Sequence, residues 1–135
     1  MSAAVPEVRH VLTILAVEEL APAVAFYRAA FSWPAVVETP VYVELSLPGG
    51  QRVGLYQRDG FGRNTGQVPI TIGAGQLAPC ELYFFTDDLD GACARMLTAG
   101  ARTLSPKSVR PWGDEAAYFA DPMGNVLVLA RPASA

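Results

Sequence analysis

The chain has 135 residues, of which 51% are hydrophobic and 17% charged, so it can build a substantial core and is not a disordered protein. Its formal net charge of -3, with no basic stripe, argues against binding to nucleic acid, whose phosphates attract clustered Lys and Arg. No apolar run approaches the ~18 residues of a membrane span, and the first residues lack the basic and apolar regions of a secretory signal, so we expect a cytoplasmic protein with no membrane partner.

The first half of the chain begins with a predicted strand at residues 9–17, which are mostly aliphatic and β-branched. Two acids follow it, and apolar residues then recur at helical spacing, so we expect a helix near residues 20–32 with the acids at its N-terminus. Three more strands are expected, at residues 36–38, 41–47 and 51–57.

The second half begins after a Gly-rich stretch, residues 59–78, which we expect to be a linker or a mobile flap. A strand at 80–86 leads to an Asp-capped helix near 88–99, which Gly100 ends in the left-handed conformation. A short strand at 101–104, a loop at 105–114 and a hairpin closed by the turn at 121–125 complete the chain.

The two cysteines, Cys80 and Cys93, show no metal-binding spacing. Cys93 falls on the apolar stripe of the second predicted helix, so we expect buried, reduced thiols rather than a disulfide.

The order of elements repeats. Val17-Glu18-Glu19-Leu20 occupies the same place in the first half as Thr86-Asp87-Asp88-Leu89 in the second. The sequence therefore predicts an α+β fold, a single domain over 1–135, built from two βαβββ modules at about 9–58 and 79–132 that are joined by the linker at 59–78. Pairing the two sheets edge to edge would give one curved mixed sheet around a concave cleft, with the helices outside.

Two motifs carry a family resemblance. Val17-Glu18-Glu19-Leu20 leads into Ala25-Phe26-Tyr27, and Pro111-Trp112-Gly113 precedes Phe119-Ala120-Asp121-Pro122-Met123-Gly124-Asn125. With these motifs the chain resembles the vicinal oxygen chelate superfamily of glyoxalase I, bleomycin-resistance proteins and extradiol dioxygenases, over about residues 9–131. The resemblance implies a homodimer, often with a cleft formed by modules from both chains.

Enzymes of this superfamily chelate a divalent metal through His and Glu, and the four matching positions here are Leu12, Gly54, Glu81 and Val128. Only Glu81 offers a metal-binding side chain, whereas metal centres usually take three or four protein ligands. His10, the single histidine, lies two residues before Leu12, and a register slip would be needed to bring it beside Glu81. We therefore predict no metal and no other cofactor, which places the chain on the bleomycin-resistance-like branch.

Side chains alternate between the two faces of a strand, so counting in steps of two from the four matched positions predicts which residues point into the concave cleft. It should hold these ligand-binding residues, together with the loop residue Trp112: Leu12, Ile14, Gly54, Tyr56, Glu81, Tyr83, Phe85, Val126 and Val128. Such an apolar, aromatic cleft is typical of a small-molecule pocket. Glu81 is the best catalytic candidate. Its carboxylate is open to three roles, a base, a receptor for a cationic ligand, or a salt-bridge partner of Arg52 or Arg58.

These features favour a metal-free protein that binds a small, aromatic drug or metabolite. Two alternatives remain open, a metal-dependent lyase or dioxygenase with an atypical site, and a structural dimer whose own side chains fill the cleft. For the binding protein, we expect Trp112 and the connector around Phe61 to close over the ligand.

Overall fold

The first module is a four-stranded sheet with one helix, within the residues 4–133 that this computed structural model describes. Its elements are β1 (Leu12–Val17), α1 (Leu20–Phe31), β2 (Ala35–Glu38), β3 (Tyr42–Ser46) and β4 (Arg52–Gln57). The strand order is β1-β4-β3-β2, with β1 parallel to β4 and the other neighbours antiparallel. The mixed sheet follows from the crossover through α1, since parallel strands need a connection of this length.

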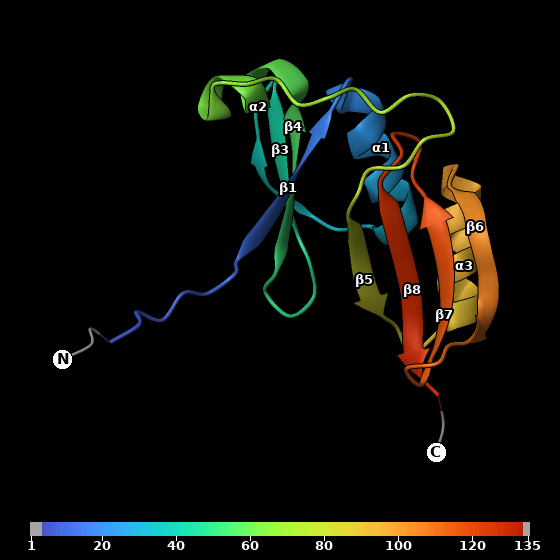
Figure 1. The fold of residues 1–135 in the computed structure, drawn as a ribbon. Coiled ribbons are helices and arrows are strands. Elements are labelled where there is room, and N and C mark those ends of the chain that lie inside the picture. The colour runs from blue at the N-terminus through green and yellow to red at the C-terminus, as the bar shows by residue number, and fades with distance from the viewer. Residues whose placement is uncertain (1–3, 134–135) are drawn as a thin grey trace.

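The second module repeats this plan (Figure 1). Its elements are β5 (Glu81–Phe85), α3 (Leu89–Ala99), β6 (Arg102–Val109), β7 (Asp114–Ala120) and β8 (Val126–Pro132). The strand order β5-β8-β7-β6 corresponds strand by strand to that of the first module. The predicted α+β class and the two βαβββ modules are therefore confirmed.

Helices α1 and α3 begin differently, although each follows a pair of acidic residues. Asp88 caps α3 as predicted, because its carboxylate accepts a hydrogen bond from the backbone N–H of Gly91 at 3.0 Å. Glu19 makes no such bond at α1, where the side-chain oxygen of Gln57 accepts from the N–H of Leu20 at 3.0 Å. Gly100 ends α3 with φ +110°, as the sequence predicted.

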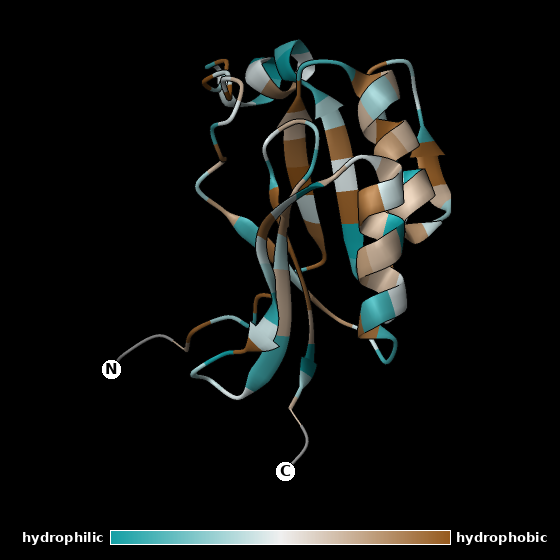
Figure 2. Ribbon diagram, turned by 90° about the vertical axis from the view of Figure 1, so that its right-hand side faces the viewer, coloured by the Kyte–Doolittle hydropathy of each residue, from teal (hydrophilic) through white to brown (hydrophobic). Residues whose placement is uncertain are grey.

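The core lies where each helix covers one face of its own sheet and the two helices pack against each other. One continuous cluster joins both modules, and its fully buried members include Tyr27, Leu45, Leu55, Leu89 and Leu127. Figure 2 shows hydrophobic residues along the helices and on the strands. Burial of each large side chain contributes roughly 1.5–3 kcal/mol, so the shared core holds the modules together.

The docking of α1 on α3 decides how the sheets are placed. Arg95 of α3 donates to the carbonyl of Ala29 and to the hydroxyl of Ser32, both at 2.9 Å, at the end of α1. With the helices in contact, the sheets remain two separate four-stranded sheets within one chain, and β1 and β5 are edge strands. The curved sheet expected from edge-to-edge pairing would require these two edges to meet.

The turn before β8 is fastened to α1 through a buried carboxylate. Asp121, which is 4% exposed, accepts from the backbone N–H groups of Met123 and Asn125 at 2.9 and 2.8 Å. Its other oxygen accepts from the Tyr27 hydroxyl at 2.6 Å, and Tyr27 is fully buried. The Asp-Pro-Met-Gly-Asn sequence is thus a turn that also links the second module to the helix of the first.

Three details differ from the predicted elements. Residues 9–11 precede β1 instead of belonging to it. Strand β6 continues through the first half of the predicted loop at 105–114, where Pro106 is tolerated because β6 is an edge strand. Part of the predicted linker forms a helix, α2 (Arg58–Thr65). Its glycines are poor helix formers, so the sequence did not predict this helix. Gly60 is nevertheless required there, because a Cβ would collide with the Tyr56 ring.

The cysteines also differ in part from expectation. Both are free thiols, and Cys93 is half-buried, but Cys80 is exposed just before β5. Among the residues described, no helix is both long and apolar enough to cross a bilayer.

Candidate functional site

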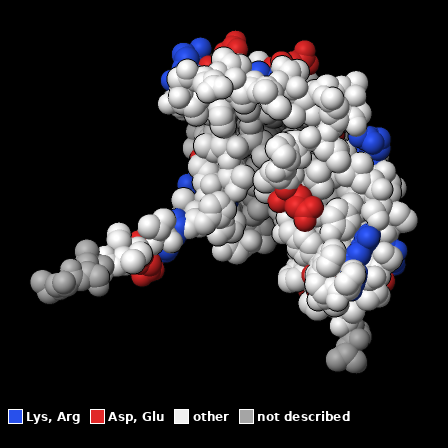
Figure 3. Space-filling model, viewed as in Figure 1, with Lys and Arg blue, Asp and Glu red and all other residues white. Residues whose placement is uncertain are grey.

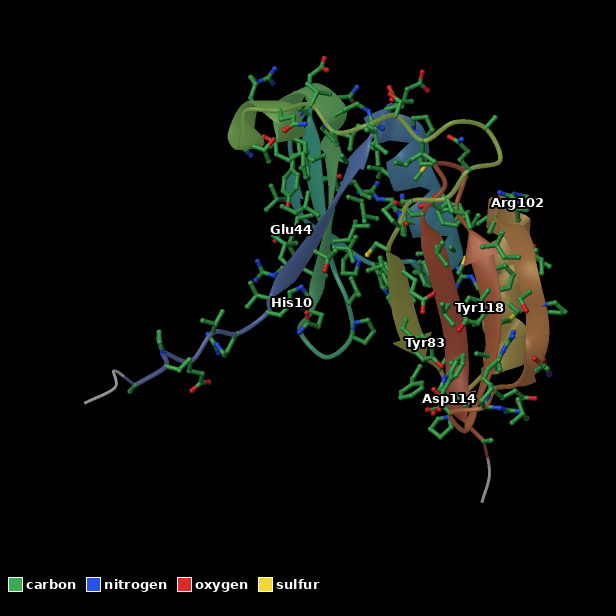
Figure 4. The ribbon with its side chains drawn as sticks, in the orientation of Figure 1. His10, Glu44, Tyr83, Arg102, Asp114 and Tyr118 are labelled. Carbon is green, nitrogen blue, oxygen red and sulfur yellow. The ribbon has the colours of Figure 1, made fainter. Side chains whose placement is uncertain are left out.

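Each sheet has one face on its helix and one face turned away from it. We call the latter the module-1 face and the module-2 face. In the first sheet, cross-strand pairing places Ile14, Gly54 and Glu44 in one row of the module-1 face. In the second, it places Tyr83, Val128 and Tyr118 in one row of the module-2 face. Figure 4 shows Glu44 on the first module, and Tyr83 and Tyr118 on the second.

The module-1 face holds a buried carboxylate that the sequence analysis missed. Glu44 is 7% exposed and accepts hydrogen bonds from the Tyr42 hydroxyl at 2.7 Å and from Arg52 at 2.9 Å. The Tyr42 ring lies over Gly54, where a Cβ would approach the ring carbons to 2.7 and 2.9 Å. A glycine in the middle of a strand signals such a close approach, so Gly54 was the available clue.

These contacts fix the protonation of the pair. The pKa of the Tyr42 phenol is raised by burial, by its hydrogen bond to Glu44 and by that negative charge. The pKa of Glu44 is lowered, first by the hydrogen bond that it accepts from Tyr42 and then by Arg52, although burial opposes this. At neutral pH the arrangement is a charged carboxylate held by a neutral phenol and a guanidinium.

The module-2 face has a filled floor and aromatic walls. A small apolar cluster of Ala116, Val126, Val128 and Ala130 forms the floor, and each member is at most 8% exposed. Leu104 and Tyr118 pack against this cluster, and the Arg110 guanidinium lies 4.9 Å from the centre of the Tyr118 ring. The part of this face that remains open therefore lies toward β5 and the β6–β7 turn.

Three side chains at that open end form one hydrogen-bond chain. The indole Nε1 of Trp112, in the β6–β7 turn, donates to the Tyr83 hydroxyl at 2.9 Å. The Tyr83 hydroxyl donates to Oδ2 of Asp114, at the start of β7, at 2.6 Å. Trp112 is 57% exposed and Phe85, whose ring meets Tyr83 edge-on at 6.0 Å, is 64% exposed. We call Tyr83, Phe85 and Trp112 the aromatic corner.

A groove of about 440 Å³ lies between β1 and β5, and its lining includes Tyr83 and Phe85 of the aromatic corner but not Trp112. Its walls include His10 and Thr13 on one side and residues 82–86 on the other. Its inner part includes Phe31 and Trp33, which stack at 4.0 Å with nearly parallel rings. Figure 3 shows a mostly uncharged surface between the two modules, with one acidic patch at the border of the second module. The groove is thus apolar and aromatic, with the dimensions of a small-molecule pocket.

The structure brings together only part of the predicted ligand-binding set. Tyr83, Phe85 and Trp112 lie close together and are accessible. Leu12, Ile14 and Tyr56 lie on the module-1 face instead, half-buried except for Ile14, which is 37% exposed. Gly54 is covered by Tyr42, and Val126 and Val128 are buried in the floor, so these three positions are not open to a ligand as predicted.

Glu81 lies exposed at the start of β5. Of the three roles left open for Glu81, the salt bridge to Arg52 or Arg58 does not form, because Arg52 pairs with Glu44 and Arg58 pairs with Glu18. The Arg58–Glu18 contact, 2.7 Å from Nε to Oε1, is an ion pair without hydrogen-bond geometry. His10 is exposed, and its Nε2 lies 3.0 Å from the Thr13 hydroxyl.

The predicted lid does not form within one chain. Phe61 belongs to α2 and packs edge-on against Tyr56 of the first module, with ring centres 6.5 Å apart. Trp112 is bonded to Tyr83 of the second module. Figure 1 places α2 and the β6–β7 turn at opposite ends of the molecule.

The four positions that match the superfamily's metal ligands are not suited to hold a metal ion. Leu12 and Val128 have purely aliphatic side chains, Gly54 has no side chain, and the Tyr42 ring occupies the space above Gly54. Over residues 4–133, no three side chains of His, Cys, Asp or Glu gather as a metal site. Glu81 alone is insufficient as a ligand set.

We predict that the dialysed protein carries no stoichiometric nickel, zinc, iron or manganese. Elemental analysis of the wild type and of Glu81→Gln checks this. A bound metal at one equivalent that disappears in the variant would contradict the prediction.

Comparison with known proteins gives one family. The sequence matches the Glyoxalase/Bleomycin resistance protein/Dioxygenase superfamily over residues 8–129. A search of curated proteins found no match.

Solved structures share the fold at low sequence identity. A glyoxalase-related enzyme from Fulvimarina pelagi is 21% identical, with 90% of this chain and 86% of that chain covered and a TM-score of 0.78. A glyoxalase/bleomycin resistance protein/dioxygenase from Nocardioides is 19% identical, with 97% and 87% covered and a TM-score of 0.78. A family enzyme from Burkholderia phytofirmans is 17% identical, with 88% and 94% covered and a TM-score of 0.76.

Proposed function

This chain belongs to the Glyoxalase/Bleomycin resistance protein/Dioxygenase superfamily, and we propose that within it the protein binds a small, planar aromatic molecule without the help of a metal. The observation that carries the proposal is the aromatic corner. Trp112 and Phe85 expose more than half of their surface, and Trp112 is held in place by its bond to Tyr83. Large aromatic side chains that are both exposed and fixed are suited to stacking on a planar ligand.

The groove supports the same proposal. Its volume of about 440 Å³ lies in the range of pockets for small molecules, and it opens beside Tyr83 and Phe85. We propose this groove as a place beside Tyr83 and Phe85 where a ligand buries further apolar surface.

A metal-dependent lyase or dioxygenase is less well supported. Such chemistry needs several convergent ligands, and the matched positions supply the Glu81 carboxylate alone. The description of similar proteins as enzymes belongs to those proteins, which share less than a quarter of their residues with this chain.

A structural dimer with a filled cleft accounts for the floor of the module-2 face, where Val128 and Ala130 are completely buried. A second copy laid over the module-2 face would also cover Trp112 and Phe85, which are exposed in one chain. The thermal-shift screen described below is therefore what separates this alternative from ligand binding.

We further propose that the protein is a homodimer. The module-1 and module-2 faces each lack an opposing wall within one chain, and β1 and β5 present free edges. A second copy that places its β1 edge beside β5 would pair both edges and give each face an opposing wall. Light scattering at micromolar concentration should give twice the 14.4 kDa mass of one chain. A mass of one chain would contradict the dimer, but it would not affect the proposal that the aromatic corner binds a ligand.

The binding proposal is tested by a thermal-shift screen of planar aromatic drugs and metabolites. A ligand present at about a hundred times its Kd should add about 2.7 kcal/mol to the free energy of unfolding, which is a readily measured rise in melting temperature. Hits should be confined to aromatic compounds. A screen in which aliphatic compounds of equal size stabilise the protein equally well would count against the role of the aromatic corner.

A further inference from the structure

The hydrogen bonds of the aromatic corner run in one direction. An indole N–H can only donate, so the Tyr83 hydroxyl must accept from Trp112 in their 2.9 Å bond. A carboxylate can only accept when it is ionised, so the hydroxyl proton points to Asp114 in their 2.6 Å bond. The Tyr83 hydroxyl has then used its only proton and one of its two lone pairs.

The phenol keeps its proton under ordinary conditions. The pKa of Tyr83 is raised, first by partial burial and then by its hydrogen bond to Asp114. Tyr83 as a whole is 38% exposed, and a bond to a ligand requires its unused lone pair to face a molecule that stacks on the neighbouring indole.

The charged groups around this hydroxyl favour the same kind of ligand. Asp114 and the exposed Glu81, both on the module-2 face, present acceptors and negative charge. The Arg110 guanidinium, just after β6, donates to the backbone carbonyls of Pro106 and Ala116 and lies over the Tyr118 ring. Its Nε and one of its two Nη groups are thus engaged within its own sheet.

We propose that Tyr83 is an obligate hydrogen-bond acceptor, and that the site selects planar aromatic molecules which carry an N–H or O–H donor on the ring edge. This inference rests on the proposed function, because it names the class of ligand that the aromatic corner takes. Asp114 is a positioning residue in it, since its carboxylate holds the hydroxyl proton away from the ligand. A ligand whose ring edge offers only an acceptor leaves the Tyr83 lone pair unpaired and meets its repulsion.

The arrangement is first tested without a ligand, through the side-chain indole N–H signals in a ¹H–¹⁵N spectrum of the full chain. The chain has two tryptophans, so Trp33→Phe removes one of the two indole signals and keeps that of Trp112. Tyr83→Phe and Asp114→Ala should each shift that signal. A matched carboxylate control, Asp90→Asn, lies at the surface pair with Lys107 and should leave it in place. A Trp112 signal that ignores Tyr83→Phe would overturn the proposal.

The selection is then tested with three probes of nearly equal shape: indole, which carries an N–H donor, 1-methylindole, in which the donor is blocked, and benzofuran, which has an oxygen instead. Titration of the same signal gives each Kd. We expect indole to bind about fivefold or more tighter than the other two, as one ordinary hydrogen bond implies. The preference should vanish in Tyr83→Phe and shrink in Asp114→Ala, whose freed hydroxyl can donate to benzofuran.

The outcomes separate the two proposals. Equal binding of indole and benzofuran, with a shift of the Trp112 signal for both, would uphold aromatic binding and overturn the acceptor role of Tyr83. Failure of all three probes to move the signal, in a protein whose ligand-free spectra behave as above, would overturn aromatic binding at this corner and the ligand class with it. A preference for indole that persists in Tyr83→Phe would assign the acceptor to another group.

Discussion

Replacing Asp121 by Ala is expected to lower the free energy of unfolding by about 3 kcal/mol or more, because one buried and three partly buried donors lose their acceptor at once. The Tyr27 hydroxyl is fully buried and has Asp121 as its partner at 2.6 Å. The N–H groups of Met123 and Asn125 and the Asn125 amide depend on the same carboxylate. Urea unfolding followed by circular dichroism measures the change, and the melting temperature should fall by roughly 10 °C.

Tyr27→Phe is the matched control, since it removes one donor and leaves the carboxylate with its three N–H partners. It should cost only about 1 kcal/mol, and the double variant should be less destabilised than the sum of the two single variants because the residues share a bond. An Asp121→Ala variant that loses no more stability than Tyr27→Phe would show that the turn holds without its carboxylate.

The same pair gives a signature at alkaline pH. The pKa of Tyr27 is raised well above its ordinary value of 10.0, first by burial and then by the charge and hydrogen bond of Asp121. Because the unfolded chain releases this proton first, the stabilisation is complete below pH 10 and declines as the pH rises further. Tyr27→Phe should remove that part of the decline.

Much of this fold could be predicted from the sequence because local signals agree with it. Helical spacing and the Asp88 cap locate α1 and α3, and the order of elements repeats in both modules. The docking of α1 on α3 could not be predicted, since it depends on contacts such as that of Arg95 with Ser32, 63 residues away, which leave no periodic trace. That docking is what keeps the two sheets apart within one chain.

The sequence could predict which face of a strand each candidate site residue occupies, because side chains alternate along a strand. It could not predict which of these residues other side chains would cover. Period-two counting correctly placed Tyr83 and Phe85 on one face of β5. It also placed Gly54 and Val128 on faces turned away from the helices, but it could not show that Tyr42 covers one and that neighbouring side chains bury the other. The Glu44 carboxylate was missed because its strand reads as ordinary alternation.

The link between Trp112 and Asp114 was likewise invisible in the sequence. Trp112 lies in the β6–β7 turn and Asp114 begins β7 two residues later, but they are connected through the Tyr83 hydroxyl of a strand some thirty residues earlier. The sequence indicated only that an indole between Pro111 and Gly113 belongs to a loop, which is correct.

Trp112→Ala is expected to weaken the binding of an aromatic ligand about tenfold or more. Stacking on an indole contributes roughly 0.5–1.5 kcal/mol beyond the area that it buries, and tenfold corresponds to about 1.4 kcal/mol. Calorimetric titration of the best hit from the screen measures the loss. Val109→Ala is the matched control, because Val109 is 65% exposed near the same turn on edge strand β6 and should bind the ligand as the wild type does.

The same variant should leave the ligand-free protein nearly as stable as the wild type. Trp112 is 57% exposed, and Tyr83 keeps its bond to Asp114 when the indole is gone. Trp33, by contrast, is 8% exposed and stacks on Phe31, so Trp33→Ala should lower the free energy of unfolding by about 3 kcal/mol or more. If Trp112→Ala instead unfolds as readily as Trp33→Ala, and the Trp112 emission of Trp33→Phe is blue-shifted and blind to ligand, the indole is a structural plug and the stacking role is wrong.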